Sequence, residues 1–534
     1  MAAGIIADQW RRDDSERVEL LDQARLSASL TKPWILPPQN QQRNQRLPES
    51  FQSVGPRGIT NLEGKMLLAL WPPNMPWMQF RLASQYQYNP GIPPEEKQSY
   101  ANSLYMLELT IQSILESSTL DPSNGRRRSG FRSQKRQALS LILITGEVLE
   151  ELTDDYRIKI FRRDQYVTKR DSTGDVLYHI IREELDPLIL SDEQLVKANL
   201  SRSDLSAKPV GERMVDIYTM AEYQPQIQMW LFSQEVNGSL IGQPSEEPVN
   251  RYMCTPFELV SGENYGRGFV EMNLGDLRSL DQLREKLLDF AAAASKFLFF
   301  LDESSLLREE DLTAKTGSVL RGRVSAGSVQ DAAVLTLNKL NDFSVVDRVH
   351  SEVRKDLGKA MLLEEEITPR GDRVTATQVN RIASELEGAL GGIYSAVSDD
   401  QQRPLLDRML WQMGKDNLID SATKEVLDRK LVDVVIMTGV AALQREIRSN
   451  QIVTFNQLLQ QVPAAAQRID PTVWSDVMAR SMGIDEPGLV KSEEQMQAEQ
   501  AAIVQQQTAI AAGQQAAEVG GDVARAALLP QEAA

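Results

Sequence analysis

A run of carboxylates could do metal chemistry. Its members are Glu364, Glu365, Glu366 and Asp372. Oxygen ligands of this kind suit Mg²⁺, and a nuclease could use such an ion. Three consecutive residues on a helix point in different directions, however, so they do not converge on one ion. The sequence favours a solvated helix end. A nuclease stays as a rival hypothesis that predicts metal-dependent DNA cleavage.

A phosphate-binding loop is the second candidate, from the sequence GITNLEGK at residues 58–65. A P-loop needs four residues between its glycines and a Ser or Thr after the lysine to reach Mg²⁺. This sequence has one residue too many, and Met66 stands in the hydroxyl position. No strand is expected before it. A turn followed by a packed helix is the better interpretation.

The chain has too few cysteines and histidines to favour nucleophilic catalysis or a zinc site. Cys254 is the only cysteine, and His179 and His350 are the only histidines. A zinc site or a His-dependent triad would need nearly all of them together, and no intrachain disulfide can form. We therefore predict no catalytic residue, no metal site and no cofactor, and a reducing compartment.

The charge balance limits how the chain can meet nucleic acid. It carries 58 Lys+Arg against 75 Asp+Glu, a formal charge of −17 with a pI near 4.9. Proteins that grip DNA neutralise its phosphates with basic side chains. This composition indicates either no nucleic-acid partner or one that is met without being held.

Neither a secretory signal nor a membrane span is expected. The apolar start at residues 4–7 is too short for a signal, and charged residues follow it. The most apolar stretch, residues 287–301, is shorter than the roughly 20 residues of a span and contains Asp289 and Lys296. A buried helix is the better interpretation of this stretch.

The elements of the first half follow from hydrophobic periodicity. Helical spacing predicts helices over residues 13–30, 59–70, 95–116 and 131–151. Alternation predicts strands over residues 156–161, 165–170, 176–182, 215–220, 226–233 and 239–241. Asn237 and Gly238 form the strongest tight-turn signal. An antiparallel meander in a mainly helical chain gives the fold class α+β.

The second half is predicted to be helical, with one insertion. Helices are expected over residues 276–301 and 331–366, on either side of a Gly/Ser/Thr-rich insertion at 304–330. The first helix could reach about 40 Å at 1.5 Å per residue. Pro369 and Gly371 then break the chain, and Thr375 is the expected N-cap of a new helix, with further helices to about residue 488.

Three basic residues mark the later part of the insertion, after Arg308. These are Lys315, Arg321 and Arg323, and no acidic residue lies between positions 312 and 329. A stretch of this kind is usually an exposed loop. The functional alternative is that it docks a partner or contacts phosphates.

Several long segments resemble one viral family in order and spacing. They are VGPRGITNL (54–62) continuing to PWM (76–78), YVTKRD (166–171), YGRGFVE (265–271) with LGDLRSL (274–280), and RVTAT (373–377) with LGGIY (390–394). The family is the portal, or head-tail connector, proteins of short-tailed bacteriophages. The resemblance covers about residues 50–490 and leaves out the first and last segments of the chain.

The resemblance implies a portal fold with an α+β wing, a two-helix stem, a small clip and a helical crown or C-terminal barrel. The implied divisions are an N-terminal arm (1–50), the wing (51–275), stem helix 1 (276–300), the clip (301–330), stem helix 2 (331–363), a channel loop (364–374), wing and crown helices (375–490), and an Ala/Gln-rich barrel or disordered tail (491–534). The sequence does not decide between the last two alternatives.

The resemblance also implies a function without catalysis. Family members form rings of twelve subunits at one capsid vertex and conduct double-stranded DNA during packaging and ejection. The implied partners are the major capsid protein, scaffolding protein, a transient terminase, tail or adaptor proteins, internal core proteins and DNA contacted without sequence specificity, but no membrane. The alternative interpretation is an internal core or tail scaffold protein that never contacts DNA.

An acidic ring suits a conduit. Twelve copies would carry 12 × (−17) = −204 formal charges, which repel a DNA backbone with one negative charge per about 1.7 Å. We expect sparse basic rings from Arg370 and Arg373 to touch that backbone, next to Glu364, Glu365 and Glu366 in the channel loop. The hinge at Pro369 and Gly371 is expected to act as a valve.

Overall fold

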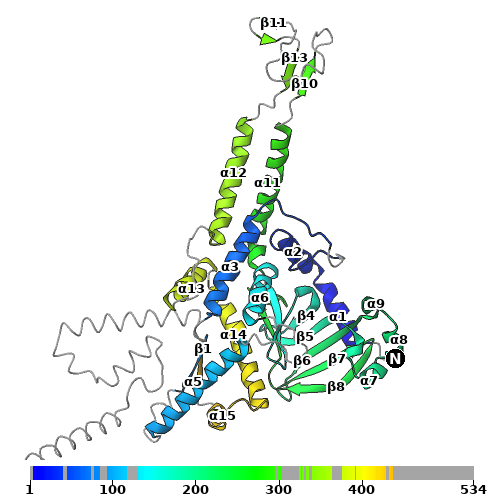
Figure 1. The fold of residues 1–534 in the computed structure, drawn as a ribbon, viewed down its shortest axis with the longest axis vertical. Coiled ribbons are helices and arrows are strands. Elements are labelled where there is room, and N and C mark those ends of the chain that lie inside the picture. Colours follow the sequence, from blue (N-terminus) through cyan, green and yellow to red (C-terminus); the bar gives the residue numbers. More distant parts are fainter. Residues whose placement is uncertain are drawn as a thin grey trace, which may run out of the picture. The chain divides into compact units, whose positions relative to one another are not determined.

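The computed structural model describes residues 4–39, 45–73, 77–83, 93–116, 130–294, 298–301, 324–325, 328–329, 332–335, 340–363, 376–390, 392–428 and 432–436. The chain forms two compact units. The first unit contains Met1–Met75 and Ser113–Asp416, and the second contains Pro76–Gln112 and Asn417–Ala534. Figure 1 shows the elements, which combine helices and antiparallel sheets and so confirm the predicted α+β class.

A five-stranded antiparallel sheet in the first unit confirms the predicted meander. Its strands, in spatial order, are β4 (Tyr166–Arg170), β5 (Val176–Leu185), β6 (Val215–Gln224), β7 (Met229–Val236) and β8 (Ser239–Glu247). Asn237 and Gly238 have φ of 51° and 78°, so they make the expected two-residue turn between β7 and β8. The Asp171 carboxylate accepts hydrogen bonds from the backbone of Thr173 and Asp175, which fixes the turn between β4 and β5.

A second, three-stranded antiparallel sheet has the order β3-β2-β9. Its strands are β2 (Glu147–Leu152), β3 (Ile158–Phe161) and β9 (Tyr252–Pro256). The predicted helix over residues 131–151 was wrong at its end, because α6 (Phe131–Thr145) stops at Gly146, which has φ of 86°. A glycine in this left-handed conformation ends a helix, and the residues that follow form β2. The two sheets pack on each other through Leu149 and Phe161 on one side and Ile181 and Phe232 on the other.

The first residues of the chain pack on the five-stranded sheet. The predicted helix over residues 13–30 is in fact two helices, α1 (Ile5–Glu16) and α2 (Val18–Ser29), separated at Arg17. Ile6 and Trp10 of α1 cover Val167 and Ile180 of the sheet, as the blue helix over the strands in Figure 1 shows. The buried Arg17 guanidinium donates to the Arg163 carbonyl at 2.6 Å, a distant contact that local periodicity does not reveal.

Short helices join the strands. They are η1 (Arg163–Gln165), η2 (Pro187–Ile189), α7 (Asp192–Lys197), α8 (Arg202–Ser206) and α9 (Val210–Arg213). The last four precede β6 and form a small cluster in which Leu195 and Leu205 pack against Ile217 and Val236 of the sheet.

Two long helices form an antiparallel hairpin. After the short α10 (Phe269–Met272), α11 (Leu274–Ala294) runs outward and α12 (Leu340–Ala360) returns beside it (Figure 1). The two predicted helices were too long at the ends that border the insertion. Residues 298–301 and 332–335 are instead β10 (Leu298–Leu301) and β13 (Ala332–Leu335), which pair antiparallel, and β11 (Val324–Ser325) pairs with β12 (Ser328–Val329). Short apolar runs suit either helix or strand, so spacing alone could not separate them.

Helix α3 (Val54–Leu70) lies at the base of the hairpin and contacts α6, α12 and α13 (Ala376–Leu390). Its buried positions Ile59, Leu62, Met66 and Leu70 confirm the predicted stripe. Helix α13 begins directly after Thr375, as expected, and is followed by α14 (Ile393–Lys415). The GITNLEGK sequence lies wholly inside α3, so it is not a loop between a strand and a helix.

The second unit contains a two-stranded sheet and helices. Strand β1 (Met78–Leu82) pairs antiparallel with β14 (Val432–Ile436). Helix α5 (Pro94–Glu116) confirms the prediction for residues 95–116, and its last residues belong to the first unit. Helix α15 (Ser421–Asp428) precedes β14. The expectation of helices throughout residues 375–488 was therefore wrong at residues 432–436, where pairing with a strand far away in sequence decides the conformation.

Glycines at two positions of α3 allow a matched test of how the hairpin is seated. A Cβ at Gly58 would lie 2.8 Å from the Cβ and Cγ of Met361, whereas a Cβ at Gly64 meets nothing within 4 Å. We expect Gly58→Ala to lower the free energy of unfolding by about 1–3 kcal/mol, because α12 must shift. Gly64→Ala should raise it by up to about 1 kcal/mol, because alanine favours a helix. Denaturant unfolding of both variants checks this, and equal effects would contradict the proposed close contact.

Candidate functional site: the helical hairpin and its anchorage

The residues predicted to meet DNA or partners lie outside the described part of the chain. This applies to Lys315, Arg321 and Arg323 of the insertion, and to Glu364, Glu365, Glu366, Arg370 and Arg373 of the channel loop. They remain predictions. The described residues do establish the elements that flank these segments: β10 and β13 border the insertion, and α12 and α13 border the loop.

The two helices of the hairpin contact each other, and each has buried apolar positions. Leu277, Leu280 and Leu287 of α11 and Leu357 of α12 are each at most 7% exposed. His350 of α12 is also buried. Burial lowers the pKa of His350, and Arg284 and Arg354 lower it further, whereas Asp347 raises it. The two helices can therefore act as one rigid element.

One carboxylate holds the near end of α11. Asp281 Oδ1 accepts hydrogen bonds from Ser50 Oγ at 2.6 Å and from the backbone N–H groups of Phe51 and Gln52 at 2.7 and 3.1 Å. These residues lead directly into α3. A charged acceptor with three donors is a strong contact, because ionised groups form the stronger hydrogen bonds. It fixes α11 to the entry of α3.

One amide holds the end of α12. Asn61 Nδ2, from the middle of α3, donates to the carbonyls of Met361 and Leu362 at 3.1 and 2.8 Å. These are the free carbonyls at a helix C-terminus, which need a donor. Leu362 has φ of 54°, so the chain turns sharply away there. Helix α12 is thus attached to α3, and α11 to the residues just before α3.

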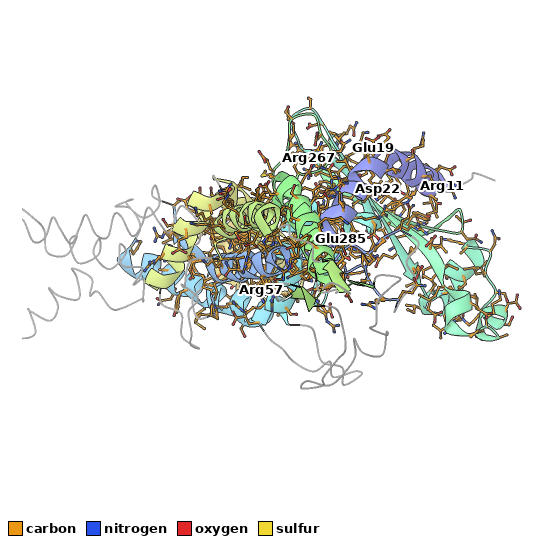
Figure 2. All side chains as sticks on the ribbon, turned by 90° about the horizontal axis from the view of Figure 1, so that it is seen from above. Arg11, Glu19, Asp22, Arg57, Arg267 and Glu285 are labelled. Carbon is orange, nitrogen blue, oxygen red and sulfur yellow. The ribbon has the colours of Figure 1, made fainter. Side chains whose placement is uncertain are left out.

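The hairpin is nearly neutral. The α11 sequence contains four acidic and three basic residues, and the α12 sequence contains four of each. The chain's net charge of −17 is therefore carried elsewhere. On α1 and α2, where Figure 2 labels Arg11, Glu19 and Asp22, acidic and basic side chains also pair locally, Arg11 with Asp8 and Arg25 with Asp22. Neither surface is the basic face that a DNA-gripping protein presents.

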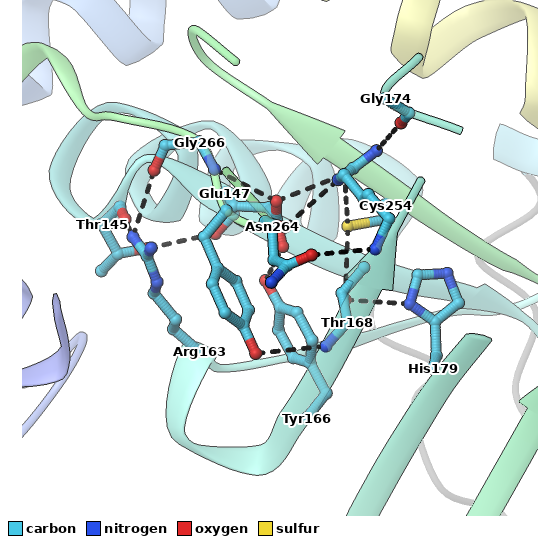
Figure 3. A network of polar contacts seen from close by, with 12 residues as sticks. Thr145, Glu147, Arg163, Tyr166, Thr168, Gly174, His179, Cys254, Asn264 and Gly266 are labelled. Carbon is cyan, nitrogen blue, oxygen red and sulfur yellow. Dashed lines mark hydrogen bonds and ion pairs between the residues drawn. The ribbon is translucent and has the colours of Figure 1, made fainter. Parts of the chain in front are cut away.

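A buried polar cluster joins the two sheets to the chain that enters the hairpin (Figure 3). The Arg170 guanidinium contacts Glu147 at 3.3 Å and donates to the carbonyls of Asn264 and Gly174 at 3.2 and 3.0 Å. Glu147 also accepts from the Gly266 N–H at 3.3 Å. Because residues 264–268 lead into α10 and α11, this cluster sets the direction in which the hairpin leaves the sheets.

Glycines allow the backbones to cross within this cluster. A Cβ on Gly146 would lie 2.8 Å from the Arg267 carbonyl carbon and from the Gly268 nitrogen. A Cβ on Gly266 would lie 2.8 Å from the Cβ of Pro256. The glycines of the YGRG sequence are thus explained by backbone contact with the α6–β2 corner.

The Cys254 thiol and the His179 imidazole beside this ion pair are held in their neutral forms. Burial, together with the Glu147 carboxylate, raises the pKa of the Cys254 thiol. His179 Nδ1 lies 2.9 Å from Thr168 Oγ1, and its ring stacks on Trp230. Within the described residues, no group of three His, Cys, Asp or Glu side chains is placed to hold a metal ion. The chemistry of this cluster is positioning.

The sequence did not indicate that Glu147, Arg163 and Arg170 lie together. A signal was present, because Arg170 and the YGRG glycines lie in segments that resemble the family. Their convergence depends on strand pairing, which spacing does not show.

No helix among the described residues is both long enough and apolar enough to cross a bilayer.

Comparison with known proteins places the fold in a family. Residues 5–490 match the family of bacteriophage head to tail connecting proteins, and the chain belongs to this family. It is a connector at the head-tail junction of a phage particle. The portal protein of Escherichia phage T7 is 28% identical over 505 residues, covering 91% of this chain and 88% of the T7 protein.

Further comparisons give the range of similarity. The portal protein of Enterobacteria phage T3 is 28% identical over 508 residues, covering 92% of this chain and 89% of that protein. The portal protein of Enterobacteria phage SP6 is 26% identical over 511 residues, covering 93% of this chain and 92% of the SP6 protein. A chain from the neck of an empty gene transfer agent particle is a weak structural match, with a TM-score of 0.35 and 9% identity over 80% of this chain and 89% of that chain.

Acidification should destabilise the fold through His179. Burial, and then the nearby Arg170 guanidinium, lower the pKa of His179 to about 3, from 6.5 in an unfolded chain. Below about pH 6.5 the unfolded chain therefore takes up a proton that the folded protein does not. Between pH 7 and pH 5 this histidine should remove about 2 kcal/mol from the free energy of unfolding.

Denaturant unfolding of the native protein and of His179→Phe at both pH values measures this effect. The variant keeps an aromatic ring beside Trp230 but has no proton to take up. It should be less stable at pH 7 and lose about 2 kcal/mol less on acidification. Because His350 is present in both proteins, its contribution cancels. The same pH dependence in both would contradict the assignment.

Proposed function

We propose that identical copies of this chain close into a ring through which double-stranded DNA passes during genome packaging and ejection. The observation that carries the proposal is the α11/α12 hairpin, in which α3 holds the end of α12 and the residues just before α3 hold the near end of α11. A conduit needs a rigid element that can be repeated around an axis. Membership of the connector family supports this use of the hairpin.

The electrostatics of the hairpin support passage without gripping. Every phosphate-lysine pair at the wall would be a point where moving DNA is retained. Hairpin helices whose charges nearly cancel, in a chain of net charge −17, avoid a continuous basic surface. Contacts to the backbone alone would give no sequence readout, since readout needs side chains in the grooves.

The channel loop is proposed to form the contact ring and the valve. Arg370 and Arg373 would touch phosphates, and Glu364, Glu365 and Glu366 would limit that attraction. Pro369 and Gly371 would provide the hinge. Support comes from the placement of this segment between α12, whose end is capped by Asn61, and α13, which packs on α3.

The insertion between β10 and β13 is proposed as the clip that docks other proteins. Lys315, Arg321 and Arg323 would contact an acidic partner or DNA. The proposed partners are a transient terminase, then tail or adaptor proteins, with the major capsid protein, scaffolding protein and internal core proteins around the ring. The proposal includes twelve subunits and gives the chain no catalytic role of its own.

Negative-stain electron microscopy of the purified full-length chain tests the ring. We expect annular particles with a central hole, and rotational averaging should give twelve subunits. DNA titration should show weak binding that falls with salt and does not depend on base sequence. A chain that stays monomeric even when coexpressed with capsid proteins would overturn the proposal, and solid particles without a hole would favour a scaffold. Tight sequence-specific binding would overturn the sliding conduit.

A further inference from the structure

Helix α14 packs beside the three-stranded sheet and buries several polar side chains. It contacts β2 and β9. Its buried polar residues are Ser398, Gln401, Gln402, Arg408 and Gln412. Helix α6, on the same sheet, instead buries an apolar run from Ala138 to Ile144, interrupted by Ser140 alone. Apart from Lys135, Ser140 and Thr145, the buried face of α6 is apolar, whereas polar side chains are spread along the buried face of α14.

The first half of α14 makes two polar contacts. Gln402 Nε2 donates to the Leu70 carbonyl at 2.6 Å, at the end of α3. Gln401 Nε2 donates to Glu150 Oε2 at 3.4 Å. Glu150 is also paired with Lys135 at 2.7 Å, and neither side chain of that ion pair is exposed. Burial lowers the pKa of Lys135, although Glu150 raises it, which shows how costly this site is for charge.

The second half of α14 continues the pattern. Arg408 Nη1 contacts Glu247 at 2.5 Å. Gln412 Nε2 donates to the carbonyls of Thr153 and Asp154 at 3.1 and 2.8 Å. Just after the helix, Asp416 accepts a hydrogen bond from the Tyr156 hydroxyl at 2.6 Å.

These contacts leave buried polar atoms unsatisfied. Among the described residues, Gln401 Oε1, Gln412 Oε1 and the Nε and Nη2 atoms of Arg408 have no hydrogen-bond partner. Each would gain a water partner if α14 moved away, so release recovers solvation. The apolar residues Val397, Leu405, Leu406, Met409 and Met413 are also buried, and they keep the docked state favoured at rest. Buried apolar side chains favour the docked state and unsatisfied polar atoms oppose it, so α14 can attach reversibly.

The position of α14 in the chain gives its release a consequence. The chain passes from the first unit to the second between Asp416 and Asn417, directly after α14, and Asn417 has φ of 56°. It also passes between Met75 and Pro76, five residues after the Leu70 carbonyl that Gln402 holds. Polar contacts of α14 thus control the chain beside two of the crossings between units.

The helix itself has a weak point. Pro404 lies inside α14, where it can donate no hydrogen bond to the preceding turn. The residues after it carry the Arg408 and Gln412 contacts. The second half of α14 can therefore separate from the sheet without breaking a complete helical hydrogen-bond ladder.

We infer that α14 is a releasable latch within the first unit of the chain. It leaves the β2-β9 face as a local event while the sheets and α6 stay folded, and its release frees the chain beside two of the points where it passes to the second unit. The inference concerns the hinge within one subunit, so it does not require the ring.

Hydrogen-deuterium exchange of the full-length protein tests the latch. Backbone amides of α14 should exchange at least tenfold faster than those of α6, because they open in a smaller event than global unfolding. Arg408→Ala should raise α14 exchange about a further tenfold and leave α6 unchanged. The control, Arg403→Ala, removes an exposed arginine from the same helix and should change the exchange rate of neither α14 nor α6.

An apolar substitution tests the same idea in the opposite direction. Replacing the buried network by Lys135→Met, Glu150→Leu and Gln401→Leu together should slow α14 exchange at least tenfold, because release would then expose apolar surface and recover no polar solvation. Exchange of α14 and α6 at one common rate in the native protein would overturn the latch. So would an Arg408→Ala effect that spreads equally to α6.

Discussion

The attachment of the hairpin to α3 is the constraint on which the rest of the structure depends. Asp281 binds the chain that enters α3, and Asn61 in the middle of α3 binds the end of α12. Gly58 lets Met361 approach between these two contacts. A long two-helix element would otherwise pivot about its base. With both helices attached to α3 or to the residues just before it, neighbouring subunits can present the hairpin at one angle, which a closed ring of identical parts requires.

Buried charge supports this arrangement by specifying geometry. The Glu147–Arg170 cluster lies where two sheets and the chain leading to α11 meet, and the Lys135–Glu150 pair lies between α6 and the same sheet. Pairs of this kind add little net stability, because removing them from water costs about as much as their attraction returns. They are intolerant of misplacement, however, because a separated partner would be a buried, uncompensated charge. The protein thus keeps its angles fixed at the hairpin base and leaves adaptable contacts at α14.

Local pattern predicted the parts of the fold that local physics decides. The alternating strands, the Asn237–Gly238 turn and the apolar stripe of α3 were all evident, and the long segments resembling the connector family indicated the architecture. The predictions were wrong where the local conformation depends on residues far away in the sequence. Strand β14 exists because β1 pairs with it, β2 follows a glycine corner that fits against Gly266, and α1 separates from α2 at an arginine whose acceptors lie near residue 163. The candidate site residues were predicted from local charge and from the resemblance, and the anchors Asp281 and Asn61 gave no signal that spacing could reveal.

Pulsed electron paramagnetic resonance measures the central claim most directly. Spin labels at Lys286→Cys on α11 and Leu177→Cys on the five-stranded sheet would report the hairpin angle, since Cys254 is shielded. Labelled chain diluted with unlabelled chain should give one narrow distance distribution. It should broaden when Asn61→Ala and Asp281→Ala are combined, and stay narrow with the exposed control Asp289→Ala. A broad distribution in the unaltered background, or a narrow one in the double variant, would contradict the account.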